Sequence, residues 1–196
     1  MADIKKIITP LTDAVVQQLK MGDSVLIHGI IYTARDSAHQ RFIEALDNNE
    51  SLPVDLKGQI LFYAGPAPAK PGDPIGSIGP TTSGRMDPFT PRLLELGLKG
   101  MIGKGNRSDT VKKAMQKHQA IYFGAIGGIA ALMAKCVRNS EVAAYKDLGP
   151  EAIHRLKVEN FPVVVVNDCY GGDLYQEGIK KFKKGTINHS RSEIFK

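Results

Sequence analysis

The feature that most constrains this chain is the alternation of short apolar segments with short segments of helical periodicity. The stretch SVLIHGIIYT, residues 24–33, is rich in β-branched side chains, which is typical of a buried strand. From Asp36 onward, apolar residues recur at three- and four-residue spacing, which predicts a helix. Further strands are predicted at 4–9, 59–63, 99–102, 120–123, 142–145 and 162–166. A further helix is predicted over 127–135, and three more are predicted to begin at the capping residues Thr12, Thr90 and Ser108.

These segments favour a single domain of the α/β class. The chain has 196 residues, of which 42% are hydrophobic, and this is enough for one substantial core. Residues 64–80 are rich in proline and glycine, which excludes regular secondary structure there. We expect residues 1–175 to form the domain and residues 176–196 to form a basic tail.

The positive charge of the chain is concentrated in that tail. The formal net charge is +6, and the tail holds six lysines and arginines against two glutamates, so it accounts for +4. The first 175 residues therefore carry the remaining +2. A strongly basic face across the domain is not expected, and we predict no nucleic-acid partner.

The cysteine count limits the metal chemistry of the chain. Cys136 and Cys169 are too few for a disulfide framework or for the thiolates of an iron–sulfur cluster or structural zinc site. We therefore predict that this chain ligates no metal alone and works in a reducing compartment, the cytoplasm. The uncharged run 119–134 has 16 residues and contains three glycines, which is too short and too broken to span a membrane. The first ten residues lack the apolar region of a secretory signal.

Three segments place cations and hydroxyls where predicted strands end and helices begin. They are YTARDSAH at 32–39, GPTTSGRMD at 79–87 and GKGNRS at 103–108. An arginine at a strand end can offer two parallel hydrogen bonds to a carboxylate. Two arginines and a lysine near one point would suit a small dicarboxylate, with hydroxyls as additional donors.

A structural role for the same arginines is an open alternative. Asp36 and Asp87 are ready partners for Arg35 and Arg85, and either aspartate could instead cap a helix. Spacing along the chain does not tell whether the three segments meet in space.

The order of these segments resembles the iron–sulfur-dependent class I fumarases. Lys104 of GKGNRS follows Arg85 of GPTTSGRMD by 19 residues, and ARDSAH lies 50 residues before that arginine. The resemblance covers residues 4–168 and is to the C-terminal domain, which in two-chain members is a separate beta subunit. It implies a swivelling β/β/α domain, with a mixed sheet and short flanking helices, that closes over a [4Fe–4S] cluster held by a larger alpha subunit. The implied reaction is reversible hydration of fumarate to L-malate, with the open iron as Lewis acid.

The resemblance also implies roles for individual residues. Arg35 and Arg85 match the clamps on the substrate carboxylates, and Lys104 matches a third cationic contact. Thr81 matches the residue at the transferred proton, so Thr81, Arg85 and Lys104 are the catalytic candidates. A threonine hydroxyl is a poor base at neutral pH, and we therefore expect Thr81 to contact substrate rather than to act as the base. The residues expected to support them are His39, Thr82, Ser83, Gly84 and Asn106.

Two alternatives to a fumarase subunit stay open. Tartrate dehydratases share the two-chain architecture and the GPTTS start, but their beta chains replace the glycine before the motif arginine and lack NRS. This chain keeps Gly84 and residues 106–108, which favours fumarate over tartrate or a substituted fumarate. A non-catalytic module that binds anions is the alternative from another class, motivated by the basic composition. We expect a hetero-oligomer without a membrane partner, and the isolated chain could self-associate.

Overall fold

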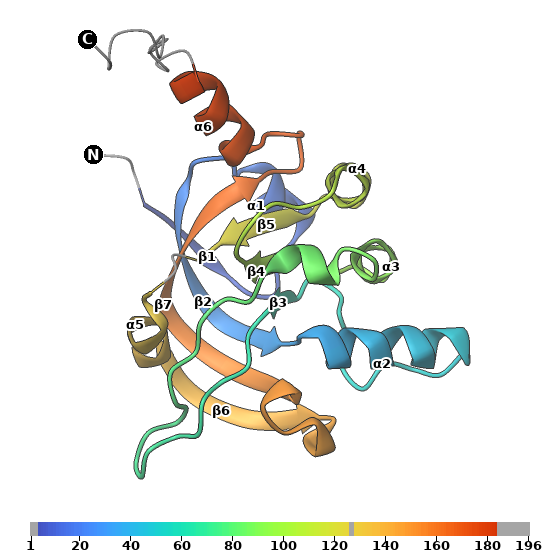
Figure 1. Ribbon diagram of the computed structural model, residues 1–196, viewed down its shortest axis with the longest axis vertical. Helices are drawn as coiled ribbons and strands as arrows, with labels where there is room; N and C mark the ends of the chain where they lie inside the picture. The colour runs from blue at the N-terminus through green and yellow to red at the C-terminus, as the bar shows by residue number, and fades with distance from the viewer. Residues whose placement is uncertain (1–3, 126–127, 184–196) are drawn as a thin grey trace, which may run out of the picture.

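The computed structural model describes residues 4–125 and 128–183 (Figure 1). In these ranges seven strands form one mixed sheet in the order β1-β2-β3-β4-β5-β7-β6. Their bounds are β1 Lys5–Ile8, β2 Ser24–Thr33, β3 Ile60–Phe62, β4 Gly100–Gly103, β5 Ile121–Gly124, β6 Val137–Ala144 and β7 Ile153–Asn167. The expected mixed α/β fold is confirmed, and β1 to β5 lie close to their predicted positions.

Five of the strands close into a ring. Strands β2, β3, β4 and β5 pair in parallel, each with the next. The long strand β7 then pairs antiparallel with both β5 and β2, which joins the two ends of this row. The ring was not predicted, because only 162–166 of β7 looked like a strand in the sequence. The charged residues between Ile153 and Phe161 concealed its first half, which pairs with β2 on one side and the exposed edge strand β6 on the other.

Short helices flank the ring, with α2, α3 and α4 together on one side (Figure 1). The helices are α1 Asp13–Gln17, α2 Asp36–Asp47, α3 Thr90–Glu95, α4 Asp109–His118, α5 Ala130–Lys135 and α6 Leu174–Lys183, with 3-10 turns η1 Ser83–Met86 and η2 Lys146–Glu151. Thr12 and Ser108 cap α1 and α4 as predicted, since each side chain accepts an N–H of the first turn. Thr90 is not the cap of α3: it lies in the first turn, and its hydroxyl donates to the Met86 carbonyl.

Two predicted segments lie partly outside the described residues. The helix predicted over 127–135 is described from 130 to 135, and position 127 lies outside. The basic tail predicted over 176–196 is described as far as 183, where it belongs to α6. No helix in the described part of the chain combines the length and apolarity needed to cross a membrane.

The apolar core has two parts, one inside the ring and one between the ring and its helices. Along β3 the side chains alternate: Ile60 and Phe62 belong to the inner part, whereas Leu61 packs in the part beneath the helices. Both parts are tightly enclosed, since Phe62 and Leu61 are both fully buried. The strands are thus packed on both faces, which fixes the positions of the loops that follow their ends.

Residues 64–80 contain no helix or strand, as predicted, and form an arm between β3 and η1 (Figure 1). The arm runs out along the β6–β7 side of the ring and returns, with Ala67 N–H bonded to the Ser77 carbonyl at 3.0 Å. Ile75 and Ile78 anchor it in the core. The return of the arm brings residues 81–85 back to the end of β3.

Candidate functional site

The three polar segments meet where the parallel strands β2, β3 and β4 end. The Thr81 N–H donates to the Tyr63 carbonyl at 2.6 Å, and the Lys104 N–H donates to the Thr81 carbonyl at 3.2 Å. The Ser83 N–H then donates to the Lys104 carbonyl at 2.9 Å. Residues 81–83 therefore lie between the ends of β3 and β4, and Arg35 follows the end of the neighbouring strand β2. The carboxyl ends of parallel strands are a common location for ligand sites in α/β proteins.

Arg85 is paired with Asp36, which begins α2. Arg85 Nε donates to Asp36 Oδ1 at 2.6 Å, and Nη2 donates to Oδ2. The Arg85 side chain is 49% exposed, so the pair lies at the surface of the site. Its hydrogen bonds lower the pKa of the Asp36 carboxyl below the usual range, against the opposing effect of burial. The sequence suggested Asp87 as the partner of Arg85, and that pairing is wrong.

Arg35 is held by a residue that sequence reasoning missed. Its Nη2 lies 3.3 Å from Glu151 Oε1 and 3.8 Å from Asp36 Oδ2. Glu151 ends η2, and its other oxygen accepts the Ser37 N–H of the first turn of α2 at 3.1 Å. A Cβ at Gly65 would lie 3.2 Å from Arg35 Nη1 and 2.8 Å from a backbone carbonyl, so glycine is required for this close approach. Nothing in the sequence around Glu151 points to this contact.

Two candidate groups are left without partners. The Lys104 side chain is exposed, and its ammonium makes no hydrogen bond or ion pair with any residue of the described ranges. The Thr81 hydroxyl, half-buried, is likewise unpaired within these ranges. Thr82, Gly84 and Asn106 are exposed around them. Donors without partners at the surface of a site are available to a ligand.

Ser83 supports the site from below rather than facing solvent. It is fully buried, and its Oγ lies 2.9 Å from the Tyr122 hydroxyl, which donates to the Gly105 carbonyl at 2.9 Å. Burial raises the pKa of Tyr122, so the phenol stays neutral and keeps its proton. A Cβ at Gly103 would collide with Ser83 Oγ, which explains the glycine at the end of β4. These contacts fix the segment 81–83 against the segment 103–105.

Arg107 is the second residue that sequence reasoning left out of the site. Its side chain is wholly buried, with Nε donating to Asp87 Oδ1 at 2.7 Å and Nη2 donating to Thr90 Oγ1 at 2.8 Å. The second oxygen of Asp87 accepts the Ser108 N–H at 2.6 Å. The buried pair therefore locks η1 to the start of α4. Arg107 is visible within GKGNRS, but its burial cannot be read from that motif.

His39 lies beneath Arg35, enclosed by the rings of Phe42, Tyr63 and Phe89. Burial lowers its pKa to about 4, so the ring is neutral and Nδ1–H donates to the Arg35 carbonyl at 2.8 Å. Its Nε2 is buried without a hydrogen-bond partner among the described residues. His39 thus supports the backbone of Arg35 and does not face the surface of the site.

The described ranges, 4–125 and 128–183, contain no group of three or more His, Cys, Asp or Glu side chains that could hold a metal ion. Cys136 follows α5 and is half-buried, and Cys169 follows β7 and is buried. Burial raises the pKa of both thiols, which keeps them protonated. Neither cysteine lies on a segment that contributes to the candidate site.

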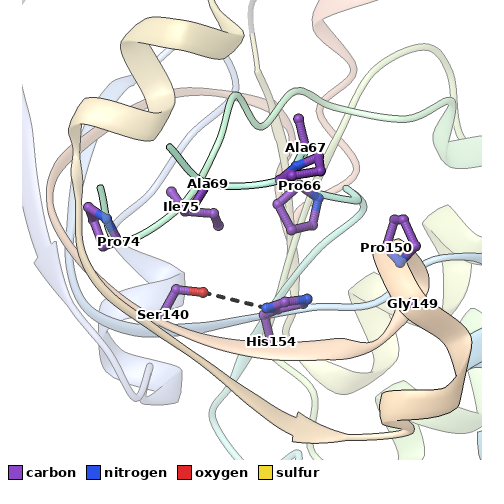
Figure 2. Close-up of a pocket in the computed structure, with 10 residues that line it drawn as sticks. Pro66, Ala67, Ala69, Pro74, Ile75, Ser140, Gly149, Pro150 and His154 are labelled. Atoms are coloured by element: carbon purple, nitrogen blue, oxygen red, sulfur yellow. Dashed lines mark hydrogen bonds between the residues drawn. The ribbon is translucent and has the colours of Figure 1, made fainter. Parts of the chain in front are cut away.

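A separate cavity of about 260 Å³ lies under the arm (Figure 2). Figure 2 shows Pro66 and Ile75 of the arm facing Ser140 and His154 of β6 and β7, and the serine hydroxyl lies 3.5 Å from His154 Nδ1. The lining is mostly proline, alanine and isoleucine. None of the candidate site residues lines this cavity, so it is distinct from the site at the strand ends.

Comparisons with known proteins agree with the early resemblance. The family profile described as "Fumarase C-terminus" matches residues 2–178. "Fumarate hydratase 1, mitochondrial" of Leishmania major is 46% identical over 151 residues, covering 76% of this chain and 28% of that protein. "Fumarate hydratase class I, aerobic" of Escherichia coli K12 is 40% identical over 166 residues, covering 84% of this chain and 30% of that protein.

A third relative differs in how much of it this chain spans. "Putative L(+)-tartrate dehydratase subunit beta" of Methanocaldococcus jannaschii is 41% identical over 177 residues, covering 87% of this chain and 91% of that protein. The chain therefore spans less than a third of the two fumarate hydratases and nearly all of the tartrate dehydratase subunit. The chain belongs to the fumarase C-terminus family of hydro-lyases.

Proposed function

We propose that this chain is the beta subunit of an iron–sulfur hydro-lyase that reversibly hydrates fumarate to L-malate. The observation that carries the proposal is the convergence of Arg35, Thr81, Arg85 and Lys104 at the ends of β2, β3 and β4. Three cations, together with a hydroxyl that has no partner among the described residues, suit a small molecule with two carboxylates. The roles of these residues, implied by the resemblance, are part of the proposal.

The arginines keep donors for the substrate although they have partners within the chain. Asp36 occupies Nε and Nη2 of Arg85, which leaves Nη1 free among the described residues. A guanidinium has five N–H groups, so a second carboxylate can still bind at its open end. The exposed Lys104 side chain, on the segment that pairs with residues 81–83, adds a further positive charge.

These cations also account for the chemical role of the chain. When a proton leaves the carbon beside a carboxylate, negative charge spreads into that carboxylate, and fixed cations stabilise it. Arg35, Arg85 and Lys104 would hold and neutralise the carboxylates in this way, while Thr81 donates a hydrogen bond close to the reacting carbon. The base is not assigned to Thr81, because its hydroxyl is too weakly acidic to act as a free alkoxide at neutral pH.

The [4Fe–4S] cluster belongs, in this proposal, to a larger alpha subunit. Two protonated cysteines outside the site support this assignment, as does the match to a relative named as a beta subunit over 91% of that relative's length. When bound, the cluster would supply Lewis-acid activation of the substrate hydroxyl. The proposal further includes a cytoplasmic location, a domain at residues 1–175 and a basic tail at 176–196.

A tartrate dehydratase subunit is the second candidate, favoured by the nearly complete match to the archaeal relative. Gly84 bears on the choice. A Cβ built there would lie 3.8 Å from the Asn106 carbonyl, an ordinary contact, so packing does not require glycine at this position. Because packing does not require glycine at position 84, this residue can instead serve the choice of substrate. The beta chains of tartrate dehydratases replace this glycine, so its presence here supports fumarate.

Anaerobic reconstitution with a larger chain that carries the cluster cysteines tests the proposal. We expect the isolated chain to contain no iron and to be inactive, and we expect fumarate hydration after reconstitution. L-tartrate assayed in parallel separates the two hydro-lyase candidates. Full turnover by the isolated, metal-free chain would refute the subunit role, and binding of anions without turnover of either substrate would favour the non-catalytic module.

A further inference from the structure

Asp36 lies between the two arginines of the candidate site. It accepts two hydrogen bonds from Arg85, and its Oδ2 also lies 3.8 Å from Nη2 of Arg35. Its backbone is fixed because it is the first residue of α2, which packs on the core through Ala38 and Phe42. A carboxylate on a fixed backbone can therefore set the position of both guanidinium groups.

The way in which Asp36 holds Arg85 leaves one end of the guanidinium open. Nε and Nη2 face the aspartate, and Nη1 points away without a partner in the described ranges. A guanidinium bound along one side by a carboxylate cannot rotate about its Cδ–Nε bond, so its open end has a fixed direction. Without Asp36, the two arginines would repel each other and Arg85 would sample many rotamers.

We propose that Asp36 is a positioning residue that orients Arg85, and with it Arg35, toward the substrate carboxylates. This inference rests on the proposed hydro-lyase function and adds to it a residue that does not itself touch substrate. The lowered pKa of Asp36 keeps the carboxylate ionised at any pH near neutrality, as this role requires.

The same helix offers a matched control. Arg41 of α2 donates from Nη1 to Asp147 Oδ1 at 2.9 Å and from Nη2 to Oδ2, so this pair is also bidentate. Its carboxylate is 63% exposed, against 33% for Asp36, and contacts one arginine instead of two. Asp147→Asn therefore breaks a second bidentate arginine–aspartate pair, whose arginine lies on the same helix as Asp36, and it changes no residue of the candidate site.

The test uses the enzyme reconstituted with its larger chain. We expect Asp36→Asn to lower kcat by about ten- to hundredfold, by analogy with the effect of removing a residue that orients a metal ligand. The KM for fumarate should stay equal or fall, since the variant loses a negative charge beside an anion site. Asp147→Asn should leave both constants within about twofold of the parent enzyme.

A double-mutant cycle separates positioning from a general structural role. If Asp36 acts chiefly through Arg85, Asp36→Asn should lower kcat much less in the Arg85→Ala background than in the parent enzyme, and only its effect on Arg35 should remain. The inference would be overturned if the losses of activity in Asp36→Asn and Arg85→Ala were additive, or if kcat were unchanged in Asp36→Asn. It would equally be overturned if Asp36→Asn raised KM at constant kcat, or if Asp147→Asn lost as much activity as Asp36→Asn. Should Asp36→Asn fail to assemble, Asp36→Glu keeps the charge but lengthens the side chain, and it should lower kcat at least threefold; parental kcat would overturn the inference. An inactive parent enzyme would instead refute the proposed function.

Discussion

The inner and outer layers of the candidate site differ in how their cations are partnered. In the inner layer, Arg107 is wholly buried and its guanidinium is held by Asp87 and Thr90. In the outer layer, Arg85 is half-exposed with a free end, and Lys104 has no partner in the described part of the chain. The inner cation shapes the loops, whereas the outer cations keep donors for a ligand. Variants in the two layers should therefore affect different properties.

The largest expected effect is on stability, from the inner layer. Arg107→Ala would leave the Asp87 carboxylate, 13% exposed, without its cation. Breaking a buried ion pair by removing one partner costs about 3–5 kcal/mol. Urea denaturation should show a loss of this size, whereas Arg85→Ala should lose less than about 1 kcal/mol because its pair is half-exposed. Equal losses in the two variants would contradict the division into layers.

The outer layer should show the opposite pattern, with activity lost and the fold retained. Removing a preorganised donor from a site that stabilises negative charge lowers kcat by about a hundred- to a thousandfold. We expect an effect of this size for Arg85→Ala, measured in the reconstituted enzyme together with its thermal unfolding. Near-normal kinetics would remove Arg85 from the carboxylate clamp.

His39 should make the inner layer sensitive to pH. Its pKa falls to about 4 in the fold from an unfolded value near 6.5, so the unfolded chain binds a proton first as the pH falls. Stability should therefore be constant above about pH 6.5 and decline between about pH 6.5 and 4, by about 3 kcal/mol in total.

Denaturation at several pH values measures this decline. His39→Asn can still donate to the Arg35 carbonyl but does not titrate, so the decline should become shallower. His154, half-buried, also has a pKa lowered by burial and should account for part of what remains. An unchanged pH dependence in His39→Asn would show that the buried imidazole is not its source.

The smallest expected effect comes from Tyr122, which joins the two layers. Tyr122→Phe removes the hydroxyl between Ser83 Oγ and the Gly105 carbonyl. Leaving a buried polar group without its partner costs about 1–3 kcal/mol, and we expect the lower end because water can reach the exposed Gly105. Denaturation measures the loss, and kcat should fall by less than in Arg85→Ala. A loss of activity as large as that of Arg85→Ala would place Tyr122 in the outer layer.

The sequence predicted local features well. Strands β1 to β5 follow from apolar, β-branched runs, and the caps Thr12 and Ser108 follow from their hydroxyls. The three polar segments could be found because cations and hydroxyls stand out at strand ends. Thr90 failed as a cap because the chain before it is already a turn, in which its hydroxyl bonds Met86.

What the sequence did not predict depends on contacts between distant segments. No local sequence pattern links Glu151 to Arg35. The sequence likewise does not show that Arg85 pairs with Asp36 rather than with Asp87. Burial of Arg107 depends on contacts with Tyr63, after β3, and with Thr90 of α3, whereas a charged residue in a loop is usually exposed. The first half of β7 has charged residues at the surface, and only its pairing with β2 and β6 identifies it as a strand.

The closure of the ring by β7 has a consequence for how the chain acquires its fold. Residues 153–167 join β2 to β5, so the ring stays open until the chain has been synthesised beyond position 167. Pairing residues so far apart in sequence carries a large loop-closure cost, which slows folding. Until then, β2 and β5 expose unpaired edges during synthesis, and such edges are prone to wrong pairing. The geometry of the candidate site is thus complete only late in folding, after its own residues have all been made.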